Sequence, residues 1–503
     1  MQFVRLVSVS QQVAATRART TKRALIAALL AATPPDEVEI VTAYLSGTLR
    51  QRRTGIGWRG VAELPAPAAS PSLEVGDVDA ALEQISRLSG EGSGTARRDA
   101  VRDLFGRLTA DEQVHLRGLV TGEVRQGALD SVVLDAIAEA AGVPATAVRR
   151  AAMFSALTGP VAVAALAGGE EALADFDLEV GRPVRPMLAS SAPDVGAGFA
   201  KVAAAGALLV DTKLDGIRVQ VHRRGDEVLV FTRSLDEIGG RLPDVVAAVR
   251  ALPGGDLVLD GEAMTLTDDG APRPFQETAS RTSASGRVDV VHPFFFDLLA
   301  VDGESLVHSP ARDRLARLDE VVPADLRIAR LETDDPGAAE EFFAGVVADG
   351  QEGVILKDPD APYAAGRRGS AWVKVKPRHT LDLVVLAVEW GSGRRHGWLS
   401  NIWLGARSGD PDDPWVMLGK TFKGMTDEML AWQTERFLAL ETHREGHVVH
   451  LRPEQVVEIA FDGLQRSTRY PGGLALRFAR VLGYRDDKTA EDADTIETVR
   501  ALV

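Results

Sequence analysis

The spacing of hydrophobic and polar positions divides the chain into three stretches. From residue 1 to about residue 182, apolar residues recur at helical spacing, as in Val78, Leu82, Ile85 and Leu88. Glycine and proline gather there in a few breaks and are sparse elsewhere. We therefore expect this stretch to be almost entirely helical.

The middle stretch, from Pro183 to about His379, changes to short runs rich in β-branched residues. Turn signals such as Arg224-Gly225-Asp226 separate these runs. Helical spacing returns between some of them, which predicts a mixed α+β domain. We expect strands over 208–210, 218–222, 228–232 and 257–259, and helices over 312–320 and 337–347.

The last stretch, from residue 380 to residue 503, again shows short strands at close spacing. They are predicted over 383–388, 401–404 and 456–460, a pattern typical of a small β-barrel. The segment Arg378-His379-Thr380 lies between the second and third stretches, and we expect it to be the hinge.

Composition narrows the chemistry. The chain has 503 residues and no cysteine, which excludes disulfides, thiolate nucleophiles, cysteine-ligated zinc and iron–sulfur clusters. Its length exceeds what one hydrophobic core usually supports, so several domains are expected. A net charge of −15 argues weakly against nucleic-acid binding, because local basic patches decide such binding and a whole-chain sum hides them.

One apolar run, Ala24 to Ala32, follows Lys22-Arg23 and faintly resembles a signal peptide. It is much shorter than a membrane span, and Pro34-Pro35-Asp36 is not a small-residue cleavage site. We interpret the run as a core helix. The expectation is a cytoplasmic protein without a membrane partner.

The helical stretch contains a partial internal repeat. Leu45 to Gln51 aligns with Val120 to Gln126, and in both copies a glycine (Gly47, Gly122) ends a helical pattern where positive φ is needed. Arginines follow both glycines. Either these are two solvated turns, or the turn amides with Arg50 and Arg125 grip two phosphates of one duplex.

The strongest chemical signal begins at Lys213-Leu214-Asp215-Gly216, where a lysine ends a buried run and a glycine leaves room for a ligand. Alone this pattern is weak. It is followed in order by Arg233, Glu262, Phe294 to Leu298, Glu352 to Lys357, Trp372 to Lys376, and Arg477 to Lys488.

This set combines a lysine with phosphate-binding cations and two carboxylates. To attack phosphorus the lysine must be neutral, which costs about 4 kcal/mol at about pH 7.5 from a usual pKa of about 10.4. Nearby cations would lower that pKa by like-charge repulsion, and the candidates are Lys357, Lys374, Lys376 and a bound metal ion. Glu262 and Glu352 are oxygen ligands suited to Mg²⁺. Phe296 offers a flat face for a purine ring.

Each element taken singly has a plainer explanation. Lys213 alone is more often a surface lysine, the two glutamates are more often solvated or paired with arginine, and Phe294 to Phe296 is more often a core strand. Their joint appearance in this order makes a set of independent plain explanations implausible.

The order of motifs resembles the covalent nucleotidyltransferase superfamily, and specifically the ATP-dependent DNA ligases of the three-domain type. Lys213 to Gly216 looks like motif I of that family, and the later segments look like motifs III, IIIa, IV, V and VI. Pro183 to Ala189, and Pro274-Phe275-Gln276 with Arg281, also resemble segments of the family. The resemblance implies a helical DNA-binding domain (1–182), an α+β adenylation domain (183–379) and a C-terminal OB-fold barrel (380–503).

The resemblance also implies a reaction. Lys213 would attack the α-phosphate of ATP, giving lysyl-AMP and pyrophosphate; AMP would pass to the 5′-phosphate of a nick, and the 3′-hydroxyl would displace it. The implied ATP-binding residues are Asp211, Arg218, Arg233, Glu262, Phe296, Arg368, Lys374 and Lys376. Glu262 and Glu352 would hold Mg²⁺. Arg477, Arg480 and Lys488 would close the barrel over ATP and its pyrophosphate, and Arg50 and Arg125 would bind DNA.

The implied substrate is nicked double-stranded DNA, in repair, recombination and replication, for an enzyme expected to be monomeric. A sliding clamp or repair proteins are the candidate partners. Two positions depart from the family pattern: Thr232-Arg233-Ser234 replaces Ser-Arg-Asn, and Asp211 replaces a common Glu. These departures put in doubt a second hydrogen bond to substrate from Ser234 and the reach of Asp211 to the base.

Three alternatives remain open at this point. An RNA ligase or a capping guanylyltransferase would use the same lysine chemistry, but the long helical stretch before Lys213 disfavours both. A non-enzymatic duplex-binding scaffold would leave all these motifs unused. An NAD-dependent ligase is disfavoured, because that family usually carries a four-cysteine zinc site and this chain has no cysteine.

Overall fold

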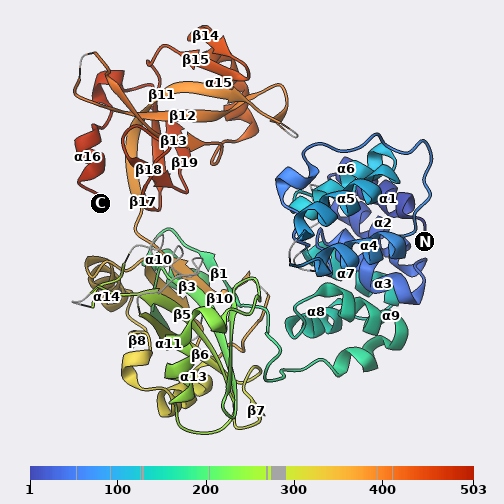
Figure 1. Cartoon of the computed structure of the whole chain (residues 1–503). Coiled ribbons are helices and arrows are strands. Elements are labelled where there is room, and N and C mark those ends of the chain that lie inside the picture. Colours follow the sequence, from blue (N-terminus) through green and yellow to red (C-terminus); the bar gives the residue numbers. More distant parts are fainter. Residues whose placement is uncertain are drawn as a thin grey trace.

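The computed structural model shows three bodies, which Figure 1 colours from blue through green to red along the sequence. An N-terminal body of helices lies apart from a middle domain of sheets and helices and a C-terminal domain of strands. The structure describes the chain except residues 52, 53, 91, 125, 127–129, 203, 205, 268, 269, 274–289, 367, 393, 394, 411 and 503 and the side chain of Arg368.

The N-terminal body consists of helices, as the sequence predicts. Their bounds are α1 (Phe3–Ala15), α2 (Arg19–Ala31), α3 (Val38–Leu45), α4 (Val75–Arg87), α5 (Ser93–Gly106), α6 (Ala110–Thr121), α7 (Asp130–Ala141), α8 (Ala145–Met153) and α9 (Thr158–Ala174). The apolar run that resembles a signal peptide forms the second half of α2 and its C-cap, Ala32, and it buries Ile26, Leu29 and Leu30, so the interpretation of a core helix is confirmed.

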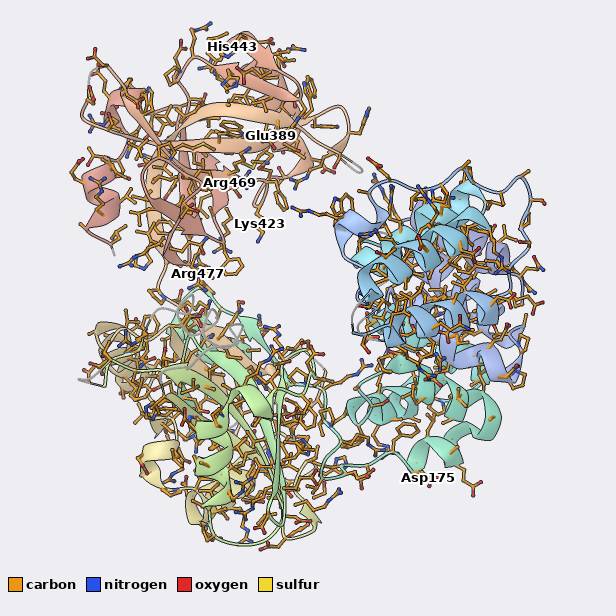
Figure 2. All side chains as sticks on the ribbon, in the orientation of Figure 1. Asp175, Glu389, Lys423, His443, Arg469 and Arg477 are labelled. Atoms are coloured by element: carbon orange, nitrogen blue, oxygen red, sulfur yellow. The ribbon has the colours of Figure 1, made fainter. Side chains whose placement is uncertain are left out.

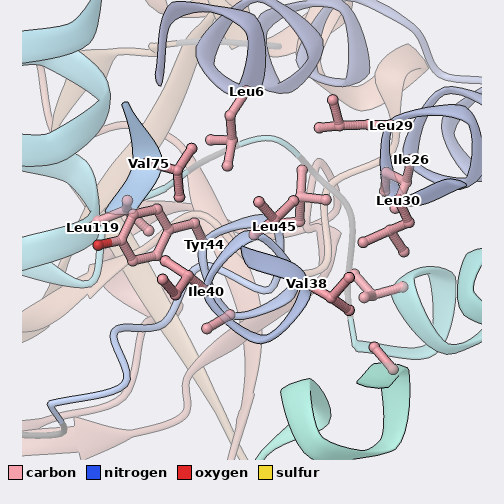
Figure 3. Packing of buried hydrophobic residues seen from close by; sticks show 14 of the residues in the cluster. Leu6, Ile26, Leu29, Leu30, Val38, Ile40, Tyr44, Leu45, Val75 and Leu119 are labelled. Atoms are coloured by element: carbon pink, nitrogen blue, oxygen red, sulfur yellow. The ribbon is translucent and has the colours of Figure 1, made fainter. Parts of the chain in front are cut away.

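The core of this body forms where the apolar stripes of the helices meet. Figure 3 shows Tyr44 of α3 among Leu6, Val75 and Leu119, which come from helices far apart in sequence. The ring of Tyr44 is fully buried and stands edge-on to Phe3, with ring centroids 6.3 Å apart. In α4 the predicted periodic positions are buried, and Leu88 lies just beyond the helix as its C-cap.

The middle domain is built on two sheets. Its elements are β1 (Leu188–Ser191), α10 (Val195–Val202), β2 (Leu208–Lys213), β3 (Ile217–Arg224), β4 (Glu227–Thr232), α11 (Pro243–Arg250), β5 (Leu257–Thr265), β6 (Val291–Val301), β7 (Glu304–Ser305), α13 (Ala311–Val321), β8 (Arg330–Thr333), α14 (Pro336–Ala348), β9 (Gly353–Lys357) and β10 (Arg368–Val375). One sheet has the order β1-β10-β9-β2-β8, and the other has the order β4-β3-β5-β6-β7.

The chain passes from the first sheet to the second at the turn after β2. β2 lies between β9 and β8, and the register places Lys213 opposite Gly353. After the turn, β3 pairs with β5, and Arg218 lies opposite Glu262. The lysine and both glutamates therefore meet where the two sheets join.

The C-terminal domain consists mainly of strands. Its elements are β11 (His379–Trp390), β12 (Leu399–Arg407), β13 (Trp415–Thr421), α15 (Asp427–Ala439), β14 (Glu441–Glu445), β15 (Val448–Leu451), β16 (Val456–Phe461), β17 (Gly463–Arg466), β18 (Leu474–Arg477), β19 (Arg480–Tyr484) and α16 (Ile496–Arg500). The long strand β11 pairs with β12, β15 and β16, so the sheet folds around it.

Two connections join the three bodies. On the N-terminal side, Arg185 donates to the carbonyl of Ser155 at 2.9 Å and forms an ion pair with Asp130. On the C-terminal side, only residues 376–378 separate β10 from β11. The predicted hinge, Arg378-His379-Thr380, thus lies too far along the chain, because His379 and Thr380 already pair with β16.

No helix in the part of the chain that the structure describes is both long and apolar enough to cross a bilayer.

Candidate active site

A cavity of about 680 Å³ opens where the two sheets of the middle domain meet the C-terminal domain. The end of β2, the start of β3 and the inner faces of β5, β6, β9 and β10 line it, and residues after β16 and β18 close its far side. From the sequence-predicted set the lining contains Asp211, Lys213, Arg218, Arg233, Glu262, Phe296, Glu352, Lys374, Lys376, Arg477 and Arg480.

Lys213 is the last residue of β2 and is partly buried. Its Nζ forms an ion pair with the carboxylate of Glu352 and lies 3.3 Å from the carbonyl of Leu214. Glu352 is held beside it because its own backbone N–H donates to the carbonyl of Lys213 at 3.0 Å. A second cation, Lys376, contacts the other oxygen of Glu352. This glutamate therefore sits between two lysines.

Asp211, two residues before the lysine on β2, is buried and bound from two sides. Lys357 Nζ lies 2.5 Å from one carboxylate oxygen, and Arg330 Nε lies 2.5 Å from the other. Burial lowers the pKa of Lys357, and the carboxylate of Asp211 opposes that shift. The expectation that Asp211 contacts a base stays a prediction, because both of its oxygens already have cationic partners here.

Phe296 and Trp372 form an aromatic wall of the cavity. Their rings stand edge-to-face with centroids 6.0 Å apart. Lys357 lies over both rings, 5.0 Å from the centroid of Phe296 and 4.4 Å from that of Trp372. Because aromatic faces attract cations and stack on flat heterocycles, the wall suits a purine ring.

Arg218 lies behind this wall in a buried network. It binds Asp260 through two parallel contacts of 2.9 and 2.5 Å and donates to the carbonyl of Met187 at 3.0 Å. The hydroxyl of Tyr363 donates to the same carboxylate at 2.6 Å. Because Arg218 lies on β3 and Asp260 on β5, these contacts hold the two strands together.

Glu262 projects from β5 and lines the cavity with Glu352. Burial raises the pKa of Glu262 to about 7, although Lys213 and Arg218 pull it down and Glu352 adds to the rise. Because burial disfavours the charged form of Glu262, a cation bound beside it would stabilise that form. Two carboxylates that line one cavity fit the oxygen-rich, water-retaining coordination of Mg²⁺.

The remaining predicted ATP ligands differ in placement. Lys374 lines the cavity together with Lys213 and Lys376. Burial and the charges of these two lysines lower the pKa of Lys374. Arg233 is exposed at the cavity lining. Arg368 begins β10, and its side chain lies outside the described part of the structure. The segment with Pro274-Phe275-Gln276 and Arg281 also lies outside it.

The C-terminal domain reaches the cavity through Arg477. Its guanidinium donates to Asp215 of the lysine turn at 2.7 Å, and Lys376 lies 3.2 Å from Asp462 of the same domain. Figure 2 labels Arg477 at the end of the C-terminal domain that faces the middle domain. Lys488 is bound to Asp382 within its own domain and is not among the described residues lining the cavity, so its role in closure stays a prediction.

The repeated turns of the N-terminal body are confirmed as turns. Gly47 has φ 73° and Gly122 has φ 69°, and the two turns lie together, since a Cβ on Gly47 would lie 3.7 Å from Val124. Arg50, however, forms an ion pair with Asp79. Arg125 lies outside the described residues, so phosphate binding by this pair remains a prediction.

Sequence patterns did not single out several residues of the site. Asp260 is a carboxylate in an otherwise buried strand, which is a signal that could have been used. Arg330, Tyr363 and Lys423 have no local signal, because they reach the site only through sheet pairing or through the arrival of another domain.

Comparison with known proteins agrees with this geometry. A family model described as the ATP dependent DNA ligase domain matches residues 186–376. Models for the ATP dependent DNA ligase C terminal region and the DNA ligase N terminus match residues 395–488 and 61–138. The three matches follow the order of the three bodies.

Relatives that match the whole chain are also named DNA ligases. A "Probable DNA ligase" of Beutenbergia cavernae is 66% identical over 100% of this chain and 99% of that protein. One from Nocardioides sp. is 61% identical over 99% of this chain and 98% of that protein. A solved structure named Pmar-Lig_PreS3 shares the fold with a TM-score of 0.64 at 19% identity, covering 95% of this chain and 99% of that one. The chain therefore belongs to the ATP-dependent DNA ligases.

Proposed function

We propose that the enzyme seals nicks in duplex DNA through an adenylate carried on Lys213. The observation that carries the proposal is the position of this amine: it ends a buried strand inside a cavity that holds an aromatic wall, a bank of cations and two carboxylates. That arrangement supplies a nucleophile, a base platform and charge stabilisation within one site.

In the first step Nζ of Lys213 attacks the α-phosphorus of ATP. A nitrogen–phosphorus bond forms, the bond to the bridging oxygen breaks, and pyrophosphate leaves. The amine must lose a proton, and Glu352 is the carboxylate in contact with it. Lys374 and Lys376 stand where they can balance the charge on the phosphates.

In the second and third steps the 5′-phosphate of the nick takes AMP from the lysine, and the 3′-hydroxyl then displaces AMP to close the strand. Phe296 would stack the adenine, with Asp211 near its edge. Arg218, Arg233 and Arg368 would position ribose and phosphate. These assignments rest on the cavity lining and on the family motifs.

Glu262 and Glu352 would hold Mg²⁺. When bound, such an ion stabilises negative charge on the phosphates. Before it binds, Glu352 has to release at least one of its two lysine partners. Glu262 has to give up the proton that burial favours.

The outer assignments form part of the same proposal. Boundaries near residues 182 and 379 would separate a DNA-binding domain, an adenylation domain and an OB fold, and the bending of a sheet around β11 supports the last. Arg477, Arg480 and Lys488 would serve closure, and Arg50 and Arg125 would serve DNA binding. A monomeric cytoplasmic enzyme of repair, recombination and replication, recruited by a sliding clamp or repair proteins, completes the proposal.

The proposal is tested by measuring the intact mass of the protein after incubation with ATP and Mg²⁺. The expected result is a gain of one adenylyl group, abolished in Lys213→Ala because no other amine has this position. Lys201→Ala is the matched control, since Lys201 is an exposed lysine on α10 that bonds only locally to the carbonyl of Ser191. A full gain of mass in Lys213→Ala would refute the nucleophile.

A further inference from the structure

The hairpin formed by β14 and β15 gathers side chains that the ligase reaction does not use. Its sequence, His443-Arg444-Glu445-Gly446-His447-Val448-Val449-His450, carries several imidazoles and a carboxylate within one tight turn. Figure 2 labels His443 at the end of the C-terminal domain opposite Arg477, so this cluster is remote from the catalytic cavity. β14 ends one side of its sheet.

Three of these side chains converge. His443 and His450 are paired across the two strands, and their rings stack in parallel, with centroids 4.3 Å apart and planes 5° apart. Glu445 follows His443 by two positions and so lies on the same face of the strand. Its two oxygens lie 3.9 Å from Nε2 of His443 and 3.8 Å from Nε2 of His450.

Thr442 indicates which nitrogen of His443 carries the proton. The threonine hydroxyl lies 3.1 Å from the carbonyl of His450 and 3.1 Å from Nδ1 of His443. A carbonyl only accepts, so the single hydroxyl proton goes to it. A hydrogen bond between this hydroxyl and Nδ1 of His443 then has Nδ1 as its donor, and the neutral ring in that tautomer carries its lone pair on Nε2, near Glu445.

The second imidazole also presents an Nε2 atom to the cluster. Nε2 of His450 is shielded from solvent and has no hydrogen-bond partner among the residues that the structure describes. The ring of Trp403 stands edge-to-face with it, centroids 5.7 Å apart, and closes that side. The two Nε2 atoms and the carboxylate oxygens thus lie near one another at separations too long for hydrogen bonds, and a modest rotation of the stacked rings would point both nitrogens at one ion.

We propose that His443, Glu445 and His450 bind a divalent transition-metal ion of the zinc class. Such ions bind imidazole nitrogen and carboxylate oxygen at about 2.0–2.2 Å, which places neighbouring ligand atoms roughly 3–4 Å apart, in line with the separations here. Two imidazoles select against Mg²⁺, which prefers oxygen ligands. Water completes the coordination, and Thr442 orients His443 from outside, as partners of metal-bound histidines commonly do.

The ion would tie the two strands of the hairpin together at an edge of the sheet. It binds the folded hairpin and not the unfolded chain, so it stabilises the C-terminal domain in proportion to the logarithm of its concentration. This role is separate from catalysis, and its failure would leave the proposed ligase reaction untouched.

The test is calorimetric titration of the metal-free full-length protein with Zn²⁺ in a buffer that contains Mg²⁺. The wild type is expected to bind one ion that the His443→Ala/His450→Ala variant does not. Thr442→Val is expected to weaken binding by about 10- to 100-fold. His447→Ala is the matched control, an exposed histidine of the same hairpin outside the cluster, and is expected to bind like the wild type.

A second readout uses Trp403. Added Cu²⁺ should quench its fluorescence in the wild type and in His447→Ala but not in the double variant, because the ring lies against His450. Equal Zn²⁺ binding by wild type and double variant, or loss of the ion only in Glu262→Gln, would overturn the proposal. So would a wild type that binds no Zn²⁺, because Glu445 would then serve only as counterion to protonated imidazoles.

Discussion

Burial and neighbouring charges together determine how easily each side chain in the cavity carries its charge. Glu262 carries a pKa of about 7 because burial outweighs the attraction of Lys213 and Arg218. Glu352, its neighbour in the lining, has two lysines in direct contact. Two chemically identical carboxylates thus differ in their surroundings: burial disfavours the charge on Glu262, whereas two lysines in contact balance the charge on Glu352.

The proton of Glu262 has a measurable consequence for stability. The folded protein keeps it up to about pH 7, whereas an unfolded glutamate releases it near its ordinary pKa of 4.5. The folded state therefore binds more protons between these values, and its stability relative to Glu262→Gln must fall as pH rises through that window. The total fall is about 3 kcal/mol. Denaturant unfolding of both proteins in metal-free buffer between about pH 5 and pH 8 measures it.

A difference between the two proteins that stays constant over this range would contradict the assigned pKa. Glu304→Gln, on the exposed strand β7, is the control and should show no such trend.

At the scale of residues, the sequence predicts which side chains line the site better than it predicts which side chains they bind. Lys213, Glu262, Phe296 and Glu352 were expected in one site, and the structure brings them together. The occupation of Arg218 by Asp260 could not be predicted, because the register of β3 against β5 creates it.

At the scale of elements, the turn between β2 and β3 determines how closely the lysine approaches β5. A Cβ placed on Gly216 would lie 2.6 Å from the carbonyl oxygen of Ala263 and 2.9 Å from Cγ of Glu262. The glycine of this motif is therefore required by close packing of backbone on backbone. It lets the turn rest against the strand that carries Glu262.

Gly216→Ala should push this turn away from β5. We expect a loss of about 1–3 kcal/mol in unfolding free energy, as for other overpacked sites, and slower self-adenylation because Lys213 shifts with the turn. Gly345→Ala is the control: it lies within α14, meets nothing within 4 Å, and should be neutral or slightly stabilising. Normal adenylation in Gly216→Ala would show that the close approach does not position the lysine.

The positions of helices and strands were predicted better than the side-chain contacts or the arrangement of the domains. The strands expected over 218–222, 257–259 and 456–460 fall within β3, β5 and β16, because alternation and turn residues are local signals. The hinge was misplaced because Arg378-His379-Thr380 carries no local sign that β11 begins at His379. Pairing with β16, far along the chain, decides that.

At the scale of the molecule, two of the ion pairs in the described structure connect the C-terminal domain to the middle domain at the cavity, one at the lysine turn and one just after β10. Arg477 binds Asp215, and Asp462 lies beside Lys376. Both pairs cross from one domain to the other at the cavity. They can open without disturbing either hydrophobic core, which is what a swinging domain requires.

Arg477→Ala should therefore separate the steps of the reaction. We expect self-adenylation to slow by roughly 100-fold, as when one preorganised donor is lost, while sealing of a pre-adenylated nick changes little. Single-turnover assays with labelled ATP and with adenylated nicked DNA measure the two steps. Arg500→Ala, an exposed arginine of α16, is the control; equal losses in both assays would refute a role confined to closure.

The arrangement of whole domains was the least predictable level. Family resemblance predicts three bodies in this order, but nothing local in Arg477 or Asp215 indicates that they meet, because 262 positions separate them in sequence. Arg50 shows the same limit, since its partner Asp79 lies in another helix.

The bond between Lys213 and Glu352 also bears on the idle enzyme. An amine held in an ion pair with a carboxylate carries a proton and has no electron pair to share. Aldehydes and acylating metabolites that modify accessible lysines would find this one unreactive until Glu352 releases it. The same contact that must break for catalysis thus preserves the reactive group between turnovers.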